Sequence, residues 1–158
     1  MKRWRVPAAL AGLFCATACG SPTVPLDLRF PSQTTFLVTR TVRVDVVALD
    51  SASLGRCPEL LAARTLDATL SVDDLAPCDV RRGLDLPDPG PGAHAFIVRA
   101  RAASNAVILE GCTVAEAYPG AAPIEVTLYP TGDYATAAAA MPPPPGATVD
   151  SICAGTAP

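Results

Sequence analysis

Six cysteines and a single histidine are the residues of this 158-residue chain best suited to chemistry. Four of the cysteines, Cys57, Cys78, Cys112 and Cys153, are separated from one another by 20, 33 and 40 residues. Zinc sites usually draw their ligands in close pairs, so this spacing, with no Cys-x-x-Cys pair, argues against zinc. An even number of distant cysteines instead predicts two disulfides, formed in an oxidising compartment.

The pairing of these four cysteines is open, because three connectivities exist. A Cys57–Cys78 bridge would close a local loop, and Cys112–Cys153 would then pin the end of the chain. A Cys57–Cys112 bridge would instead tie the central loop to a strand. Each bridge should contribute about 2–4 kcal/mol, which matters in a chain with only 5% aromatic residues.

His94 is the second chemical candidate, since it follows Gly92 and Ala93 at the start of a predicted strand, where a general base could lie. Nucleophilic catalysis also needs a serine or cysteine on a strained turn, and the chain has no Gly-x-Ser-x-Gly motif. We therefore interpret His94 as a solvent-facing loop residue and assign no catalytic residue. A small periplasmic hydrolase or metal-dependent enzyme using His94 is the alternative.

Two groups of acidic residues raise the question of a metal: Asp73, Asp74 and Asp79, then Asp85 and Asp88. Loops of extracellular sandwiches hold calcium with such carboxylates, but neither group has the regular spacing of a calcium loop. We interpret both groups as solvated turn residues, with a calcium site as the alternative. The sequence predicts no cofactor.

The N-terminus has the order of features found in a signal peptide. Lys2, Arg3 and Arg5 precede an apolar stretch at 8–14, and small residues at 16–18 precede Cys19. This order resembles the lipobox of bacterial lipoproteins, which implies that Cys19 is acylated and becomes the first mature residue. A plain secretory signal cleaved after residue 18 is the alternative. Cys15 follows the bulky Phe14 and is expected to leave with the signal.

Net charge bears on the partners of the mature chain. The whole chain carries a net charge of −3, and removal of residues 1–18 leaves nine arginines against 15 acidic residues, or −6. This balance argues against a nucleic-acid partner and against a basic membrane-binding patch. Membrane association should therefore depend on the lipid anchor. Gly20 after the cysteine implies, by the same resemblance, export to the outer membrane, on its periplasmic or surface face.

Apolar and polar residues alternate with period two in the stretches 36–48, 65–72, 96–101 and 124–128. Shorter strand candidates are 26–30, 82–86 and 107–114, and only 58–64 reads as a helix, with Pro58 in its first turn. Asn105 is expected to adopt a positive φ in a hairpin at 103–106. Arg40 interrupts an apolar face and predicts a bend or bulge.

These elements predict an all-β fold, an antiparallel β-sandwich of about seven strands with two disulfides and a Pro/Ala-rich C-terminal tail. The expected organisation is a signal peptide at 1–18, a short tether at 19–25, the sandwich at 26–130 and the tail at 131–158.

Residues 84–128 are similar to small transthyretin-like or carboxypeptidase-regulatory-like domains. The similarity is carried by Leu84-Asp85-Leu86-Pro87, by Gly90-Pro91-Gly92, and by the strands at 96–100 and 124–128. It implies a β-sandwich with an accessory or binding role and transfers no catalytic residue. With the lipobox, it predicts a non-enzymatic, lipid-anchored envelope protein with a protein or polysaccharide partner. A small-ligand carrier is a further alternative, which would require an apolar cavity.

Overall fold

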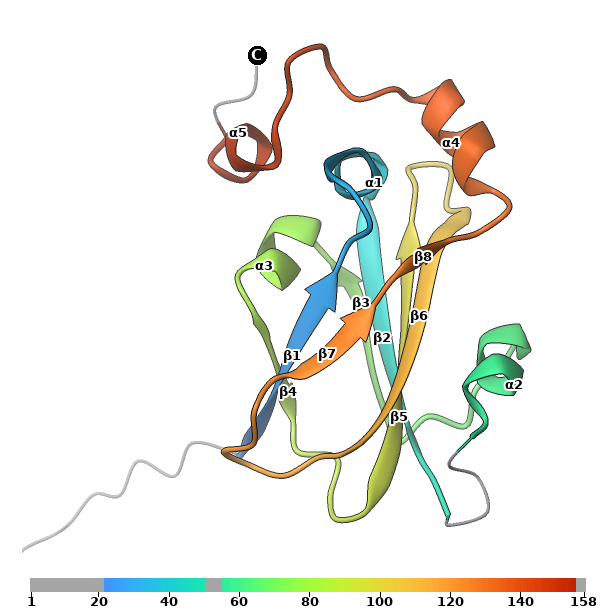
Figure 1. Ribbon diagram of the computed structural model, residues 1–158, viewed down its shortest axis with the longest axis vertical. Helices are drawn as coiled ribbons and strands as arrows, with labels where there is room; N and C mark the ends of the chain where they lie inside the picture. The colour runs from blue at the N-terminus through green and yellow to red at the C-terminus, as the bar shows by residue number, and fades with distance from the viewer. Residues whose placement is uncertain (1–21, 51–54, 156–158) are drawn as a thin grey trace, which may run out of the picture.

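Two β-sheets share one hydrophobic core in the computed structural model, which describes residues 22–50 and 55–155 (Figure 1). The strands are β1 (Thr23–Arg29), β2 (Thr41–Ala48), β3 (Leu70–Leu75), β4 (Leu84–Pro87), β5 (Ala93–Arg101), β6 (Val107–Glu116), β7 (Ile124–Thr127) and β8 (Tyr129–Pro130). The helices are all short: α1 (Gln33–Val38), α2 (Cys57–Ala62), α3 (Pro77–Arg81), α4 (Tyr134–Ala140) and α5 (Val149–Cys153).

The smaller sheet has the strand order β4-β1-β7 and the larger one β3-β2-β5-β6-β8. Alternate residues of both sheets point inward, where Val24 and Leu26 of β1 join Val44 of β2 and Phe96 of β5 in the core. This arrangement confirms the predicted all-β fold with two disulfides. The prediction of a wholly antiparallel sandwich is wrong, since β1 pairs with β7 in parallel.

The two sheets come together at the corner where β6 passes beside β7. A side chain at Gly111 of β6 would overlap the carbonyl oxygen of Thr127, so this position has room for no Cβ atom. Two residues along, the hydroxyl of Thr113 donates a hydrogen bond of 2.9 Å to the carbonyl of Glu125. Glycine in a strand interior often marks such a close backbone approach.

The predicted strand at 36–48 is wrong in its first half, where the chain forms α1 before β2 begins at Thr41. A capping box starts the helix, because Ser32 and Thr35 exchange hydrogen bonds of 3.1 Å between side chain and backbone. Phe36 and Val38 are buried, but from a helix. Arg40 lies between the two elements, so the predicted bend at this residue is a change from helix to strand.

The predicted strand at 65–72 is also displaced, since β3 begins only at Leu70. The chain returns here from α2, which lies over the outer face of the larger sheet, and residues 63–69 cover that distance (Figure 1). The other predicted strands match β1, β4, β5, β6 and β7 to within a few residues. The predicted helix at 58–64 is confirmed by α2, with Pro58 in its first turn, and Asn105 has a φ of +67°. The expectation that this is the only helix is wrong, because α1, α3, α4 and α5 also form.

Candidate functional site

All four cysteines of the predicted mature domain are paired. Cys57 of α2 bonds to Cys112 of β6, and Cys78 of α3 bonds to Cys153 of α5. Of the three connectivities left open by the sequence, the structure has the one that ties the central segment to a strand. The first bridge holds α2 against the outer face of the larger sheet. The second bridge joins the C-terminal helix α5 to helix α3.

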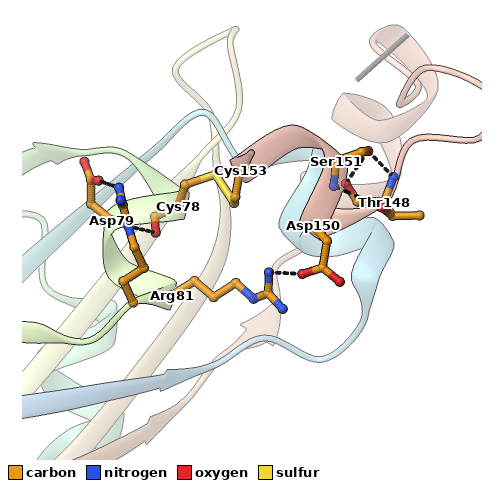
Figure 2. Close-up of a disulfide and its surroundings, with 8 residues drawn as sticks. Cys78, Asp79, Arg81, Thr148, Asp150, Ser151 and Cys153 are labelled. Atoms are coloured by element: carbon orange, nitrogen blue, oxygen red, sulfur yellow. Dashed lines mark hydrogen bonds and ion pairs between the residues drawn. A yellow bond between two sulfur atoms is a disulfide. The ribbon is translucent and has the colours of Figure 1, made fainter. Parts of the chain in front are cut away.

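The C-terminal segment is held on the sandwich mainly by this second bridge (Figure 2). Beside it, Arg81 donates to Asp150 at 2.6 Å, and the exposure of both side chains makes this pair a weak contributor. The side-chain amide of Gln33 donates to the carbonyl of Ala147 at 3.2 Å. A capping box of Thr148 and Ser151 starts α5, which itself buries no residue.

An apolar groove with a volume of about 750 Å³ lies at the end of the sandwich covered by α1, α4 and the C-terminal segment (Figure 1). We call it the end groove. Five parts of the chain that are distant in sequence form its walls: 36–41, 74 with 76–78, 102–104, 137 with 140–144, and 152. Helix α4 and the prolines 142–144 form the side that the Cys78–Cys153 bridge holds in place.

The chemistry of the end groove is that of an apolar ligand site. Phe36 lies in its wall and is fixed from behind by an edge-on contact with Phe30, whose ring centroid is 5.0 Å away. Alanines, prolines and Met141 supply most of the remaining surface. Among the described residues that line it, Arg40 and Asp74 are the charged ones, and both are exposed. Ligand sites of this size are typically apolar with a few polar groups that orient the ligand.

His94 is not the solvent-facing loop residue that the sequence predicts, because it is a buried residue of β5 with 2% of its surface exposed. The strand starts at Ala93, so His94 pairs in register with Ala48 and Ala115 on the neighbouring strands. Its Nδ1 donates to the carbonyl of Gly92 at 3.0 Å. Asp85, an acidic residue that could have supported a catalytic His94, is an exposed residue of the other sheet.

The acidic residues are distributed over separate ion pairs and turns. Asp73 pairs with Arg43, Asp79 pairs with Arg82, and Asp88 accepts a hydrogen bond from the backbone N–H of Gly90. Within residues 22–50 and 55–155, no three histidine, cysteine, aspartate or glutamate side chains lie close enough together to hold a metal ion. Cys19, the predicted lipidation site, lies outside the described residues.

A cluster of polar side chains on the outer face of the larger sheet is centred on Asp45, whose side chain is only 1% exposed. Arg43, two residues earlier on the same face of β2, donates to both carboxylate oxygens at 2.8–3.0 Å. Ser71 donates at 2.6 Å from β3, and Arg99 of β5 lies 3.7 Å away. Arg43 also reaches Asp73, so these residues connect three adjacent strands.

Arg99 extends the cluster to the helix. Its Nη2 donates to the carbonyl oxygens of Leu60, Leu61 and Ala63 at 3.2–3.3 Å, at the C-terminal end of α2. The carbonyl of Leu60 also accepts from the backbone N–H of Ala63, the residue that caps the helix. The last carbonyls of a helix need such additional donors, and an arginine is favourable at this end of the helix dipole. Arg99 and the Cys57–Cys112 bridge therefore fix opposite ends of α2 on the sheet.

The ionisation of Asp45 reflects these partners. Burial by itself would raise the pKa of its carboxyl group. The hydrogen bonds from Arg43 and Ser71, with the charges of Arg43 and Arg99, outweigh burial and lower this pKa below its usual value. The carboxylate in turn raises the pKa of Arg43. Asp45 is therefore charged at neutral pH and fully partnered.

The sequence contains one signal for this cluster, the spacing of Arg43 and Asp45. Arg43 and Asp45 are separated by two positions in a strand and so must share a face. The expectation that Arg99 and Arg101 lie on an outer strand face is confirmed, since they alternate with the buried Val98 and Ala100. What joins Arg99 to Asp45 is the pairing of β2 with β5, which single-strand patterns do not contain.

No protein-family model, curated protein or solved structure matches this chain. No helix among the described residues is long and apolar enough to cross a membrane.

Replacement of Asp45 by asparagine should lower the free energy of unfolding by about 2–4 kcal/mol, because Arg43 and Arg99 lose the charge that compensates them. The matched control is Asp73→Asn, whose side chain is 54% exposed and pairs with the same arginine; it should cost less than about 1 kcal/mol. Urea denaturation at neutral pH measures both. Equal stability of the two variants would contradict the role given to Asp45.

The stabilisation due to the Asp45 charge should also depend on pH. Because the folded pKa is lowered, this stabilisation is complete above the unfolded pKa of about 3.9 and is lost as pH falls through the folded value. The stability difference between the wild type and Asp45→Asn should therefore shrink below about pH 4. A difference that stays constant down to pH 2 would show that the charge contributes nothing.

Removal of the second bridge by Cys78→Ser with Cys153→Ser should free the C-terminal segment while leaving the two sheets folded. The two cysteines are 75 positions apart in the sequence, and removal of a native disulfide from a small domain costs about 2–5 kcal/mol. Backbone amides of α5 should exchange with solvent at least tenfold faster in hydrogen-exchange experiments. Arg81→Ala is the control and should leave α5 protected; equal protection in the cysteine variant would contradict this prediction.

Proposed function

We propose that this protein is a lipid-anchored, non-enzymatic binding module of a bacterial cell envelope, and that its end groove takes a small apolar ligand. The observation that carries the proposal is the groove itself. Its volume of about 750 Å³ falls in the range of about 300–1,000 Å³ typical of small-molecule sites. The predicted small-ligand carrier requires such a cavity, and helices and loops form most of its walls.

The envelope location is supported by the cysteines. Every cysteine of the domain beyond Cys19 is in a disulfide, as expected of an oxidising compartment outside the cytoplasm. The N-terminal pattern that ends at Cys19 supplies the export signal and the attachment point for the acyl chains. Two or more chains suffice for a stable anchor, so the acidic domain needs no basic surface to stay at the membrane.

The position of the tether favours a ligand that arrives from the side away from the membrane. The chain enters the domain at Thr23, the first residue of β1, and β1 runs from there towards α1 and the groove (Figure 1). The start of β1 therefore lies at the end of the sandwich opposite the end groove, and we place the membrane on that side (Figure 1). In this orientation the groove is open to molecules carried between membranes or across the cell surface.

The other candidates fit the groove less well. A polysaccharide would leave its hydroxyl groups without partners against alanine and proline, and burying unpaired polar groups is unfavourable. A hydrolase based on His94 would require that side chain to reach a substrate, whereas it is buried in β5. A partner protein of the accessory type remains compatible with the anchor, but no feature of the groove selects it over a small molecule.

The anchor is tested by metabolic labelling of bacteria that produce the full chain with radiolabelled palmitate. The wild type and Cys15→Ala should incorporate the label, and Cys19→Ala should lose it, because the acyl chains are expected on Cys19 alone. The protein should also move from the membrane to the soluble fraction in Cys19→Ala. Label retained in that variant would contradict lipidation at Cys19.

Occupation of the groove is tested with the neutral fluorescent probe N-phenyl-1-naphthylamine, whose emission rises in apolar surroundings. Ala140→Trp places a large side chain in the groove and should weaken probe binding at least tenfold. The control is Ala139→Trp, on the exposed side of the same helix and outside the groove lining; it should bind the probe like the wild type. Equal binding by both variants would contradict the groove as the ligand site.

A further inference from the structure

A second hollow, of about 310 Å³, lies on the outer face of the larger sheet and has a lining different from that of the end groove. It is bounded by β2 and β5 on one side and by the segment 64–66, which follows α2, on the other. Four arginines line it: Arg43, Arg64, Arg99 and Arg101. We call it the arginine hollow.

This concentration of positive charge contrasts with the net negative charge of the mature chain. The residues after the signal contain nine arginines against 15 acidic residues, yet four of these nine line a single small hollow. Its lining contains one acidic residue, Asp45, and Arg43 reaches Asp73 at the edge. The local charge is therefore positive on a domain whose overall charge is negative.

The register of the strands makes the arrangement costly. Arg43 lies directly opposite Arg99 in the pairing of β2 with β5, and Arg101 is two residues further on the same face. Like charges directly opposite one another destabilise a sheet. Asp45 relieves the repulsion between Arg43 and Arg99, since it interacts with both.

Arg64 and Arg101 take no part in the ion pairs that Asp45 makes with Arg43 and Arg99. Arg101 donates to the side-chain oxygen of Asn105 at 3.0 Å, which is a neutral partner. Arg64 is exposed and has neither an ion pair nor a side-chain hydrogen bond with any residue in the described part of the chain. Both guanidinium groups thus retain donors that can reach a ligand in the hollow.

We propose that the arginine hollow binds a small oxyanion, namely a carboxylate, sulfate or phosphate group, between Arg64, Arg101 and the accessible part of Arg43. The planar fork of an arginine matches such groups with two parallel hydrogen bonds. Asp45 holds Arg43 in position by accepting hydrogen bonds from its guanidinium group, and the neighbouring Thr65 adds a hydroxyl group to the wall. The volume suits a free anion or one acidic sugar unit, at the lower end of ligand sites.

The inference is independent of the end groove, because the two sites share no lining residue. The anion site also does not depend on whether the protein carries a lipid anchor. An anion site beside an apolar site would allow the protein to hold two chemically different groups at once.

The experiment is an isotope-labelled NMR titration of the mature domain at low ionic strength with inorganic phosphate, sulfate and glucuronate, in separate arms. Saturable shifts of the arginine side-chain signals of the hollow are expected in at least one arm. Phosphate or sulfate alone indicates a free-anion site, and glucuronate alone indicates an acidic-sugar site. Absence of saturation with all three anions up to about 10 mM, a threshold equivalent to roughly −3 kcal/mol of binding, would overturn the proposal.

The variant for this test is Arg64→Gln with Arg101→Gln, which leaves the Asp45 cluster intact. It should reduce the affinity for the bound anion at least tenfold, with an unchanged melting temperature. The matched control, Arg81→Gln with Arg82→Gln, removes the same charge from an exposed helix elsewhere and should bind as the wild type does. Equal loss in both double variants would mean that only overall charge matters, and it would contradict the site.

Discussion

The disulfide between Cys78 and Cys153 is the bond on which the end groove depends. The segment that it holds is rich in alanine and proline. Both side chains bury little apolar surface, and proline also lacks a backbone N–H donor. Helix α4 buries Ala137 alone, and α5 buries no residue. Such a segment gains too little from packing to offset its conformational entropy. The covalent link removes much of that entropy in advance, so the groove can have one wall made of weakly packing residues.

The Cys57–Cys112 disulfide and the Asp45 cluster hold α2 on the larger sheet in a similar way. Cys57–Cys112 and the contacts of Arg99 with the last carbonyls of α2 hold this helix over β5 and β6. Asp45 supplies the negative charge without which Arg43 and Arg99 would repel each other across the strand pair. The end groove and the arginine hollow thus each have one wall that is attached by a disulfide rather than by an extensive core.

Much of the fold could be predicted from period-two alternation, since β5 and β6 have buried faces that no helix would produce. The errors have local causes. The spacing of Phe36 and Val38 favours a strand, whereas the capping box of Ser32 and Thr35 starts a helix. The strand β5 starts only three residues earlier than predicted, yet this shift buries His94. Neither site could be found from sequence, because both depend on strand pairing and on a disulfide connectivity that residue spacing leaves open.

The most direct test of the account is native mass spectrometry of the protein purified from bacterial envelopes, without organic extraction, compared with the Ala140→Trp variant. The account predicts that the wild type carries an apolar molecule at close to one per chain, and that the variant, with its groove filled, does not. An empty wild-type protein, or an equal load on both proteins, would contradict the claim that the end groove is the binding site.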